Sequence, residues 1–521
     1  MASNFVVHFL FISSLSLATS STFANNGINW WCNQTPNPNP CKYFMSHDLK
    51  PKHKADFKKM MIQIALDRTR FSHNQTKELI HKLKNNEHDK VAWADCLTLY
   101  ENTISELNKT LNPTKKYRTE FDKQTWLSTA LTNLETCKSE LFDQLGHVLD
   151  FIPPHIYNNV SELISNGLAM HNKLAIPQTQ TYKLGFPTWV TRRDRKLLQS
   201  SSTKAANLVV AKDGSGNFKT IREALDAAAK RTRSSGRFVI HIKSGVYAEY
   251  LRIGTDLKNI MLVGDGMEST IITGNRSKGG GFTIFTSATV AVTSDGFIAR
   301  DITFRNTAGP QNNQAVALRV GSDLSVFYKC GFEGYQDTLY AHSQRQFYRE
   351  CNIYGTIDFI FGNAASIFQN CNIFVRKPLS SQKNVVTAQG RTDPNQNTGI
   401  IIQKSRIAPS SDLKPVISSF PTYLGRPWKK YSRTIFMENF LDSFINPSGW
   451  LKWDGSKFAP NTLFYGEYKN YGPGSSTSER VNWGGYKIFT SVAQVSQFSV
   501  ANFIGGQSWL PAAGVPFSSG I

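Results

Sequence analysis

The chain has 521 residues, a length that favours two or more domains over one. Hydrophobic residues make up 40% of the chain and charged residues 19%, a composition that excludes a disordered protein. The formal net charge of +21 favours a polyanionic partner, and nucleic acid, anionic lipid and acidic polysaccharide all fit it. A basic surface that only aids solubility is the alternative.

Residues 1–24 are predicted to be a signal peptide. Residues 5–17 are largely apolar and small residues follow up to Ala24, although no Lys or Arg precedes the apolar run. The run is short for a membrane-spanning helix and no later stretch is long and apolar enough, so we expect a soluble, exported protein. Five sequons agree with export and are predicted glycosylation sites: Asn33, Asn74, Asn108, Asn159 and Asn275.

The next region, residues 25–180, has apolar residues at helical spacing. Four apolar stripes, which begin at Phe57, Trp93, Trp126 and Leu163, predict an antiparallel four-helix bundle. Nothing in this half indicates catalysis.

Cysteines divide into a group of four in the first half and a group of three in the second. No C-x-x-C pair occurs, so a zinc site is not expected. In an exported protein the first group predicts two disulfides. Cys96 and Cys137 lie on the apolar stripes of two predicted helices and suit a bridge between them, while Cys32 and Cys41 are placed to close a small loop.

Residues 181–198 are predicted to be a linker, which is polar and contains proline before it ends in the basic run 192–198. Accessible linkers are where proteolysis concentrates, so we expect processing here. A solvated linker that stays uncut is the alternative.

Residues 199–521 contain short β-type runs separated by Gly and Asn turns, with one helix predicted at residues 220–230 and Thr220 as its N-cap. The segments FYKCGF, YRECNI and FQNCNI repeat around Cys330, Cys351 and Cys371, at spacings of 21 and 20 residues. This period, without a helix in the unit, predicts an all-β right-handed parallel β-helix, with the early helix capping one end. A β-sandwich is the runner-up, but it does not explain the repeat.

Two aspartates take the same phase of this repeat. Asp337 lies seven residues after Cys330, and Asp358 lies seven residues after Cys351. Adjacent parallel strands are about 4.8 Å apart, so the two carboxyl groups should be neighbours. Such a pair is unfavourable unless one member is protonated, which is how active sites hold an acid and a carboxylate together. A lone aspartate would more often be a turn residue.

Neighbouring polar residues extend the candidate site. Gln336 precedes Asp337, and Gln314 lies about one coil earlier, so their amides could stabilise an oxyanion. Arg426 is a candidate partner for the ionised aspartate. The sequence contains no G-x-S-x-G, H-E-x-x-H, P-loop or G-x-G-x-x-G, which argues against serine hydrolases, zinc proteases and common nucleotide enzymes.

Five motifs together resemble the plant pectin methylesterases, over about residues 205–512. They are GVYAE at 245–249, QAVAL at 314–318, QDTL at 336–339, DFIFG at 358–362 and LGRPW at 424–428. The helical half looks like the pectin methylesterase inhibitor domain, and Arg195, Lys196, Leu197 and Leu198 resemble the family's processing site. Phe282 departs from the Trp expected there, which puts one substrate contact in doubt.

The resemblance implies hydrolysis of the C6 methyl esters of homogalacturonan in the cell wall, by a monomer without a metal or other cofactor. It implies Asp358 as the nucleophile and Asp337 as the proton donor and base. Gln314 and Gln336 would hold the oxyanion, and Arg426 would orient Asp358. Thr283, Phe361 and Trp428 would contact sugar rings, and the family favours a Cys351–Cys371 disulfide, although the repeat permits Cys330–Cys351 equally. The resemblance implies inhibitor proteins and a processing protease as protein partners. It implies no binding to nucleic acid or to membranes.

Two other functions stay open from sequence alone. One is another pectin-active β-helix enzyme, a lyase or a polygalacturonase. The other is a non-catalytic wall-binding protein whose helical half inhibits other esterases. The prodomain could inhibit its own catalytic half, assist folding or retain the precursor in the cell.

Overall fold

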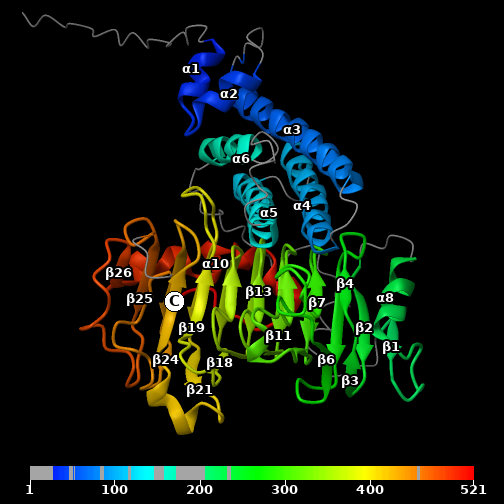
Figure 1. Ribbon diagram of the computed structural model, residues 1–521, viewed down its shortest axis with the longest axis vertical. Helices are drawn as coiled ribbons and strands as arrows, with labels where there is room; N and C mark the ends of the chain where they lie inside the picture. Colours follow the sequence, from blue (N-terminus) through cyan, green and yellow to red (C-terminus); the bar gives the residue numbers. More distant parts are fainter. Residues whose placement is uncertain are drawn as a thin grey trace, which may run out of the picture.

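A computed structural model describes residues 27–45, 51, 53–82, 87–114, 119–145, 158–171, 206–230, 236–453 and 458–521. It consists of a helical bundle that stands on one side of a long stack of strands (Figure 1). The predicted signal peptide (1–24) and linker (181–198) lie outside the described residues, and so do Arg195 to Leu198 of the predicted processing site. Among the described residues, no helix is long and apolar enough to cross a membrane.

The bundle contains the four predicted helices, preceded by two short ones. Its helices are α1 (Ile28–Asn33), α2 (Pro38–Phe44), α3 (Lys54–Lys82), α4 (Glu87–Leu111), α5 (Glu120–Leu145) and α6 (Asn158–His171). The predicted stripes form its core, where Phe57, Leu107 and Leu163 are fully buried. The prediction of a four-helix bundle is therefore confirmed.

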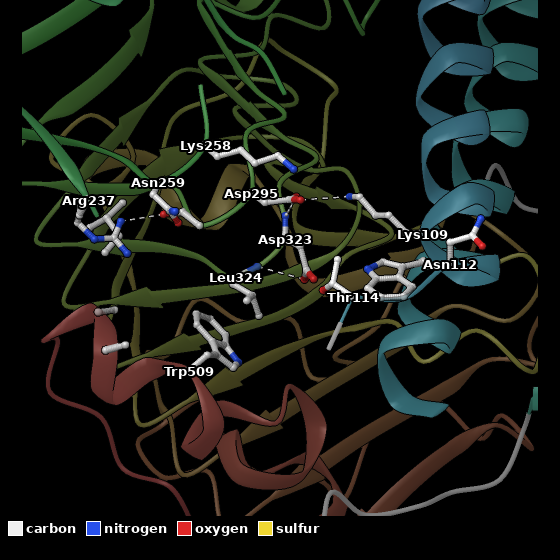
Figure 2. Close-up of a pocket in the computed structure, with 15 residues that line it drawn as sticks. Lys109, Asn112, Thr114, Arg237, Lys258, Asn259, Asp295, Asp323, Leu324 and Trp509 are labelled. Carbon is white, nitrogen blue, oxygen red and sulfur yellow. Dashed lines mark hydrogen bonds and ion pairs between the residues drawn. The ribbon is translucent and has the colours of Figure 1, made fainter. Parts of the chain in front are cut away.

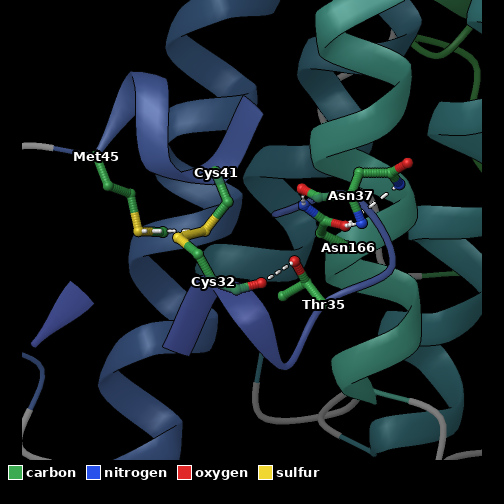
Figure 3. Close-up of a disulfide and its surroundings, with 6 residues drawn as sticks. All are labelled: Cys32, Thr35, Asn37, Cys41, Met45 and Asn166. Atoms are coloured by element: carbon green, nitrogen blue, oxygen red, sulfur yellow. Dashed lines mark hydrogen bonds between the residues drawn. A yellow bond between two sulfur atoms is a disulfide. The ribbon is translucent and has the colours of Figure 1, made fainter. Parts of the chain in front are cut away.

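Two disulfides lie in the bundle, between the cysteines that the sequence pattern paired. Cys32–Cys41 joins α1 to α2, and Cys96–Cys137 joins α4 to α5. Figure 3 shows how the first of these is held against α6. The Asn37 N–H donates to Asn166 Oδ1 and Asn166 Nδ2 donates to the Asn37 carbonyl, both at 2.8 Å.

Removal of the Cys96–Cys137 bond by Ser substitutions is expected to lower the free energy of unfolding of the bundle by about 4 kcal/mol, since the bond closes a long loop. The matched Cys32→Ser/Cys41→Ser variant, which opens a shorter loop, should lose about 3 kcal/mol. The two bonds span 41 and 9 residues. Denaturant unfolding of the full chain, followed by far-ultraviolet circular dichroism, measures both. A larger loss from the shorter loop would contradict the expectation.

The strands of the described residues form three parallel sheets, with eleven, seven and eight strands. In spatial order the first comprises β1 (Leu208–Val210), β2 (Phe238–Ile242), β5 (Ile260–Gly264), β8 (Ile298–Arg300), β11 (Ser325–Tyr328), β14 (Arg345–Arg349), β17 (Ala365–Gln369), β20 (Gly399–Gln403), β23 (Arg433–Met437), β25 (Phe464–Tyr468) and β26 (Tyr486–Phe489). The second comprises β22 (Thr422–Pro427), β19 (Asn384–Gln389), β16 (Ile360–Gly362), β13 (Leu339–Ala341), β10 (Leu318–Val320), β7 (Val290–Val292) and β4 (Leu251–Ile253). The third comprises β24 (Phe440–Leu441), β21 (Arg406–Pro409), β18 (Asn372–Val375), β15 (Asn352–Gly355), β12 (Gly331–Glu333), β9 (Thr303–Asn306), β6 (Thr270–Gly274) and β3 (Gly245–Ala248).

This order is that of a parallel β-helix, because each coil contributes one strand to each sheet. The predicted repeat is the coil. Phe327, Tyr348 and Phe368 stack on successive coils with ring centroids 4.9 and 4.3 Å apart. A left-handed corner recurs before each repeat cysteine, at Lys329, Glu350 and Asn370. The β-helix prediction is confirmed and the β-sandwich is excluded.

The repeat cysteines are the point at which the structure departs from the family expectation. Cys330, Cys351 and Cys371 are three buried thiols, and the implied Cys351–Cys371 bond is not formed. Cys351 Sγ lies 3.4 Å from the carbonyl oxygens of Phe327 and Arg349, so the thiol has partners within its own and the preceding coil.

Short helices cover one end and one side of the β-helix. Thr220 caps α8 (Ile221–Ala229) as predicted, with Oγ1 accepting from the Glu223 N–H at 3.2 Å. At the C-terminus, α9 (Val492–Val495), α10 (Val500–Phe503) and α11 (Leu510–Ala513) pack their apolar residues against the eleven-stranded sheet. Short 3-10 helices occur at Pro310–Asn312, Lys414–Ser419, Ser496–Phe498 and Gly506–Ser508.

Candidate active site

Asp337 and Asp358 occupy equivalent corners of neighbouring coils. Each lies two residues before a strand, and those strands, β13 and β16, pair in register through Leu339 and Ile360. Both aspartates have left-handed backbone, with φ of 62° and 50°. Asp tolerates this conformation better than most residues, so the chain turns here and directs two carboxyl groups to the same side. The pairing of these strands therefore places the two carboxyl groups on neighbouring coils, as the sequence repeat predicts.

The surroundings of Asp337 favour its neutral form. Its side chain is buried, and burial raises the pKa of its carboxyl well above the usual range, with the charge of Asp358 acting in the same direction. Arg426 and Lys278 lower this pKa, but they do not cancel the effect of burial. A protonated Asp337 can donate a proton at neutral pH.

Asp358 is held by Arg426, which comes from β22. Arg426 Nε lies 2.9 and 3.1 Å from the two carboxylate oxygens, and a terminal nitrogen lies 2.7 Å from Oδ2. This forked contact fixes the plane of the carboxylate and balances its charge. The guanidinium also lies 4.2 Å from the ring centroid of Trp453, which limits its movement.

A cleft of about 500 Å³ opens over these residues. The two glutamines line it together with the aspartates and the arginine, so the structure gathers all five predicted catalytic residues. Gln314 is one coil before Gln336, since the Ala315 N–H donates to the Gln336 carbonyl at 3.2 Å.

Aromatic rings line the rest of the cleft. Tyr340 and Phe361 stack with centroids 4.2 Å apart, and Trp428 meets Phe361 edge-on at 5.9 Å. Tyr340 was missed by the sequence analysis, although it follows Asp337 by three residues as Phe361 follows Asp358. Trp453 was also missed and carries no repeat signal. Such ring faces are suited to stacking on a sugar.

Thr283 does not line this cleft. It is buried beneath the bundle, where its hydroxyl donates to Asp95 of α4. The neighbouring Phe282, which replaces the expected Trp, instead lies against the guanidinium of Arg276 at 4.9 Å.

The roof of the cleft is α5. Seven residues from its C-terminal half line the cavity opposite the catalytic pair: Glu135, Thr136, Lys138, Ser139, Glu140, Phe142 and Asp143. The Phe285 N–H donates to Glu140 Oε1 at 3.1 Å, and Lys429 Nζ donates to Ser139 Oγ at 3.1 Å. The bundle core also continues into the β-helix residues Phe285, Val316 and Tyr340.

Further contacts anchor the bundle beside the cleft. Arg345 forms a buried ion pair with Asp323 of its own domain at 2.7 Å and with Asp122 of α5 at 2.9 Å. The Ser128 hydroxyl donates to Asn397 Oδ1 at 3.1 Å, and the Ser128 carbonyl accepts from Gln396 at 3.0 Å. The contact between the domains therefore combines ion pairs and hydrogen bonds with apolar packing.

A second cavity, of about 290 Å³, lies at the edge of this interface (Figure 2). Lys109 of α4 reaches across it to Asp295 at 3.1 Å, and Asp323 accepts from the Leu324 N–H at 3.1 Å. Trp509 forms part of its wall. Since Asp323 is also the partner of Arg345, these acids belong to the contact between the domains.

The predicted glycosylation sites differ in accessibility. Asn33, Asn74 and Asn275 are exposed, whereas Asn108 and Asn159 are half-buried. Glycosylation stays a prediction at all five. Within the described part of the chain, no group of three or more His, Cys, Asp and Glu side chains could hold a metal ion.

Comparison with known proteins identifies the family. A family model described as Pectinesterase matches residues 207–507, and one described as Plant invertase/pectin methylesterase inhibitor matches residues 26–170. Pectinesterase 2 of Citrus sinensis is 59% identical over 507 residues, 96% of each chain. Probable pectinesterase/pectinesterase inhibitor 17 of Arabidopsis thaliana is 55% identical over 520 residues, 99% of each chain.

Solved structures agree. Pectin methylesterase from carrot has a TM-score of 0.60 and 58% identity, and the match covers 62% of this chain and all of that one. The fungal enzyme from Aspergillus niger has a TM-score of 0.51 and 30% identity, covering 60% of this chain and 97% of that one. Fold and relatives define a carboxylic ester hydrolase built on a β-helix. The chain belongs to the pectinesterase family, and residues 26–170 form a domain of the plant invertase/pectin methylesterase inhibitor family.

Proposed function

We propose that the chain removes methyl groups from homogalacturonan, using Asp358 as nucleophile and Asp337 as acid and base, under the control of its own prodomain. The observation that carries the catalytic proposal is the pairing of unlike carboxyl groups. Burial raises the pKa of Asp337 and so favours its neutral form, while the guanidinium of Arg426 holds the carboxylate of Asp358 through a two-pronged contact.

The first half-reaction forms an acyl-enzyme. An Asp358 oxygen attacks the ester carbonyl, and the side-chain amides of Gln314 and Gln336 hold the resulting oxyanion. Collapse of this intermediate breaks the bond to the methoxy group. Asp337 gives its proton to the departing methanol, which leaves a mixed anhydride between Asp358 and the sugar carboxyl group.

The second half-reaction restores the enzyme. Asp337, now ionised, takes a proton from a water molecule that attacks the anhydride carbonyl. The galacturonate carboxyl group is released, Asp358 regains its negative charge and Asp337 is protonated again. Arg426 orients the Asp358 carboxylate before the attack and receives it again after hydrolysis.

The substrate proposal rests on the cleft and on the charge of the chain. Tyr340, Phe361 and Trp428 offer ring faces to sugars. The net charge of +21 suits a polymer that gains one carboxylate per turnover. The names of the relatives agree with pectin as substrate, and pectin places the enzyme outside the cell, in the wall.

The proposal for the prodomain is inhibition in cis. The C-terminal half of α5 roofs the catalytic cleft, so a polysaccharide cannot lie across the aspartates while the bundle is docked. Of the three roles that sequence allowed, this geometry supports inhibition. Proteolysis at the basic run 192–198 then allows the bundle to leave.

To test the proposal, the full chain is made with a protease site engineered into residues 181–198 and is then cut there. Methanol release from methylated pectin is measured with the cut protein. Methanol without new reducing ends, and without sensitivity to a chelator, is expected. New reducing ends would support a polygalacturonase, and loss of activity with a chelator would support a lyase. Pectin binding without methanol release would support a wall-binding protein.

Docking of the bundle in the cut chain is expected to weaken as pH rises. Burial, followed by the charges of Asp95 and Asp143, raises the pKa of Glu140 from 4.5 to about 8 in the docked state. Burial also raises the pKa of Asp95 from 3.8 to about 6, although Thr283, Arg319 and Arg252 oppose it. Both acids bind protons more tightly when docked, so their full contribution is present below about pH 4 and is lost progressively towards pH 8.

Between pH 5 and pH 7 the dissociation constant should rise at least about tenfold, because one pKa unit corresponds to about 1.4 kcal/mol. Gel filtration of the cut chain at several pH values gives the bound fraction. Glu140→Gln, which does not titrate, should show a smaller pH dependence. Docking that tightens as pH rises would contradict the assignment.

A further inference from the structure

A second pair of aspartates lies on neighbouring coils, apart from the residues that line the catalytic cleft. Asp295 lies three residues before Ile298 of β8, and Asp323 lies three residues before Val326 of β11. Ile298 and Val326 pair in register, so the two aspartates take the same phase of the coil. The Asp323 N–H donates to Asp295 Oδ1 at 3.4 Å. Two carboxylates so placed repel each other, and the arrangement calls for cations beside them.

Each of these aspartates has a cation as its partner, and the two cations come from different domains. Arg345 of β14 donates to Asp323 from Nε at 2.9 Å and from a terminal nitrogen at 2.7 Å, which is a two-pronged contact inside the β-helix. Asp295 instead pairs with Lys109 of α4 at 3.1 Å, across the cavity of Figure 2. The ion-pair partner of Asp295 therefore comes from the bundle.

Arg345 in turn takes a second carboxylate from the bundle. Its other terminal nitrogen donates to Asp122 Oδ1 of α5 at 2.9 Å, and the two side chains are only 4% and 7% exposed. The bundle itself orients this carboxylate. Asp122 Oδ2 accepts from the backbone N–H and the hydroxyl of Thr119 at 3.2 and 2.7 Å, a contact that caps the first turn of α5. Oδ1 is left to face the guanidinium.

The two contacts between the domains have opposite polarity. The β-helix supplies the carboxylate of Asp295 and the guanidinium of Arg345. The bundle supplies the ammonium group of Lys109, near the end of α4, and the carboxylate of Asp122, near the start of α5. Glu106, one turn earlier on α4, also holds the ammonium group at 2.7 Å. Crossed charges of this kind fix the register of an interface and exclude partners that place like charges together.

We propose that these crossed ion pairs select the inhibitor domain that the catalytic half accepts. The fitting partner is a helical inhibitor domain that carries an ammonium group near the end of one helix and a carboxylate near the start of the next. A domain that reverses either charge brings like charges together and is rejected. The inference rests on the proposed inhibition in cis and adds the choice of inhibitor to it. The roof over the cleft blocks the substrate, and the ion pairs decide which domain forms the roof.

Recognition of Asp295 by Lys109 is tested with a double-mutant cycle in the cut chain. Gel filtration at several protein concentrations gives the dissociation constant of the bundle. Lys109→Gln and Asp295→Asn should each raise this constant about tenfold, and the double variant should bind no more weakly than the weaker single variant, because both changes remove one contact. Lys77→Gln, at an exposed position of α3, should match the wild type. Losses that multiply in the double variant would overturn the assignment.

The contact between Asp122 and Arg345 has a control of its own. An asparagine at position 122 can keep the cap of α5 with its carbonyl oxygen, but it then turns an amide N–H group towards the guanidinium. Asp122→Asn should therefore raise the dissociation constant at least about tenfold. Asp56→Asn makes the same change at the start of α3, where Asp56 Oδ2 accepts from the His53 N–H at 3.1 Å, and should not weaken docking. Equal constants for the two variants would overturn the role of Asp122, with melting temperature as the check on folding.

Selection itself is tested by exchange between two cut chains. The wild type and Lys109→Glu, one of them isotopically labelled, are mixed in equal amounts near the dissociation constant of the wild type. Mass spectrometry of the complex isolated by gel filtration should find the wild-type bundle at least about tenfold more often than the variant bundle. A Lys77→Glu bundle should share the catalytic halves equally with the wild type.

The outcomes separate the inference from the proposed function. Equal occupancy by the Lys109→Glu bundle would overturn selection by charge, while the wild-type precursor stays inhibited. A wild-type bundle that leaves the catalytic half at every concentration, from a precursor that is as active as the cut chain, would instead overturn inhibition in cis.

Discussion

Asp358→Asn is expected to lower methanol release by the cut chain at least about a thousandfold, because it replaces the nucleophilic carboxylate with a neutral amide of the same shape. Asn also accepts the left-handed backbone at this corner, where φ is 50°. Hydroxylamine, which captures reactive acyl groups, should yield more sugar hydroxamate with the wild type than with Asp358→Asn, whose yield should equal that of the uncatalysed reaction with the methyl ester. The assay is methanol release under saturating pectin, with melting temperature as a check on folding.

The matched control is Asp301→Asn, which makes the same replacement at another left-handed corner, with φ of 56°, outside the cleft. It should retain wild-type activity. Asp337→Asn should lose about a hundred- to ten-thousandfold, since general acids contribute on that scale. Activity of Asp358→Asn within about tenfold of the wild type would exclude the covalent mechanism.

The sequence could predict the catalytic pair because the β-helix repeats in sequence as it does in space. Equal distances from Cys330 and Cys351 became equal positions on neighbouring coils, and the pairing of Leu339 with Ile360 gives that register. Left-handed corners recur at Lys329 and Glu350, at the same place in the two coils that carry the repeat. Such repeated positions can be predicted from sequence without knowing which distant residues are in contact.

The roof of the cleft could not be predicted in the same way. Thr136 and Glu140 are polar residues on α5. In an amphipathic helix, polar residues of this kind are predicted to face solvent. They are buried only because the β-helix lies against them, where Thr136 Oγ1 is 3.0 Å from His342 Nε2. The burial of Thr283 could not be predicted either, because its hydrogen-bond partner Asp95 is 188 residues away in sequence. Contacts between two independently patterned domains leave no periodic signal.

The intact precursor is expected to release methanol at least about a hundredfold more slowly than the cut and separated chain. Docking in the precursor is intramolecular, and short flexible links commonly give effective concentrations in the millimolar range. Even a modest affinity of the bundle for the cleft therefore keeps the cleft covered. The assay compares the precursor before and after cleavage in residues 181–198, with and without dilution.

A bulky charged substitution at the interface between the domains distinguishes inhibition from other roles of the bundle. Ser128 of α5 is buried against Gln396 and Asn397, so Ser128→Glu places a charge and extra volume between the domains. Burying an unpaired charge costs several kcal/mol, and the intact Ser128→Glu precursor should approach the activity of the cut chain. Ala55→Glu, which adds the same charge at an exposed position of α3, should stay inhibited. If the wild-type precursor is as active as the cut chain, the bundle serves folding or retention, and the roof over the aspartates opens without cleavage.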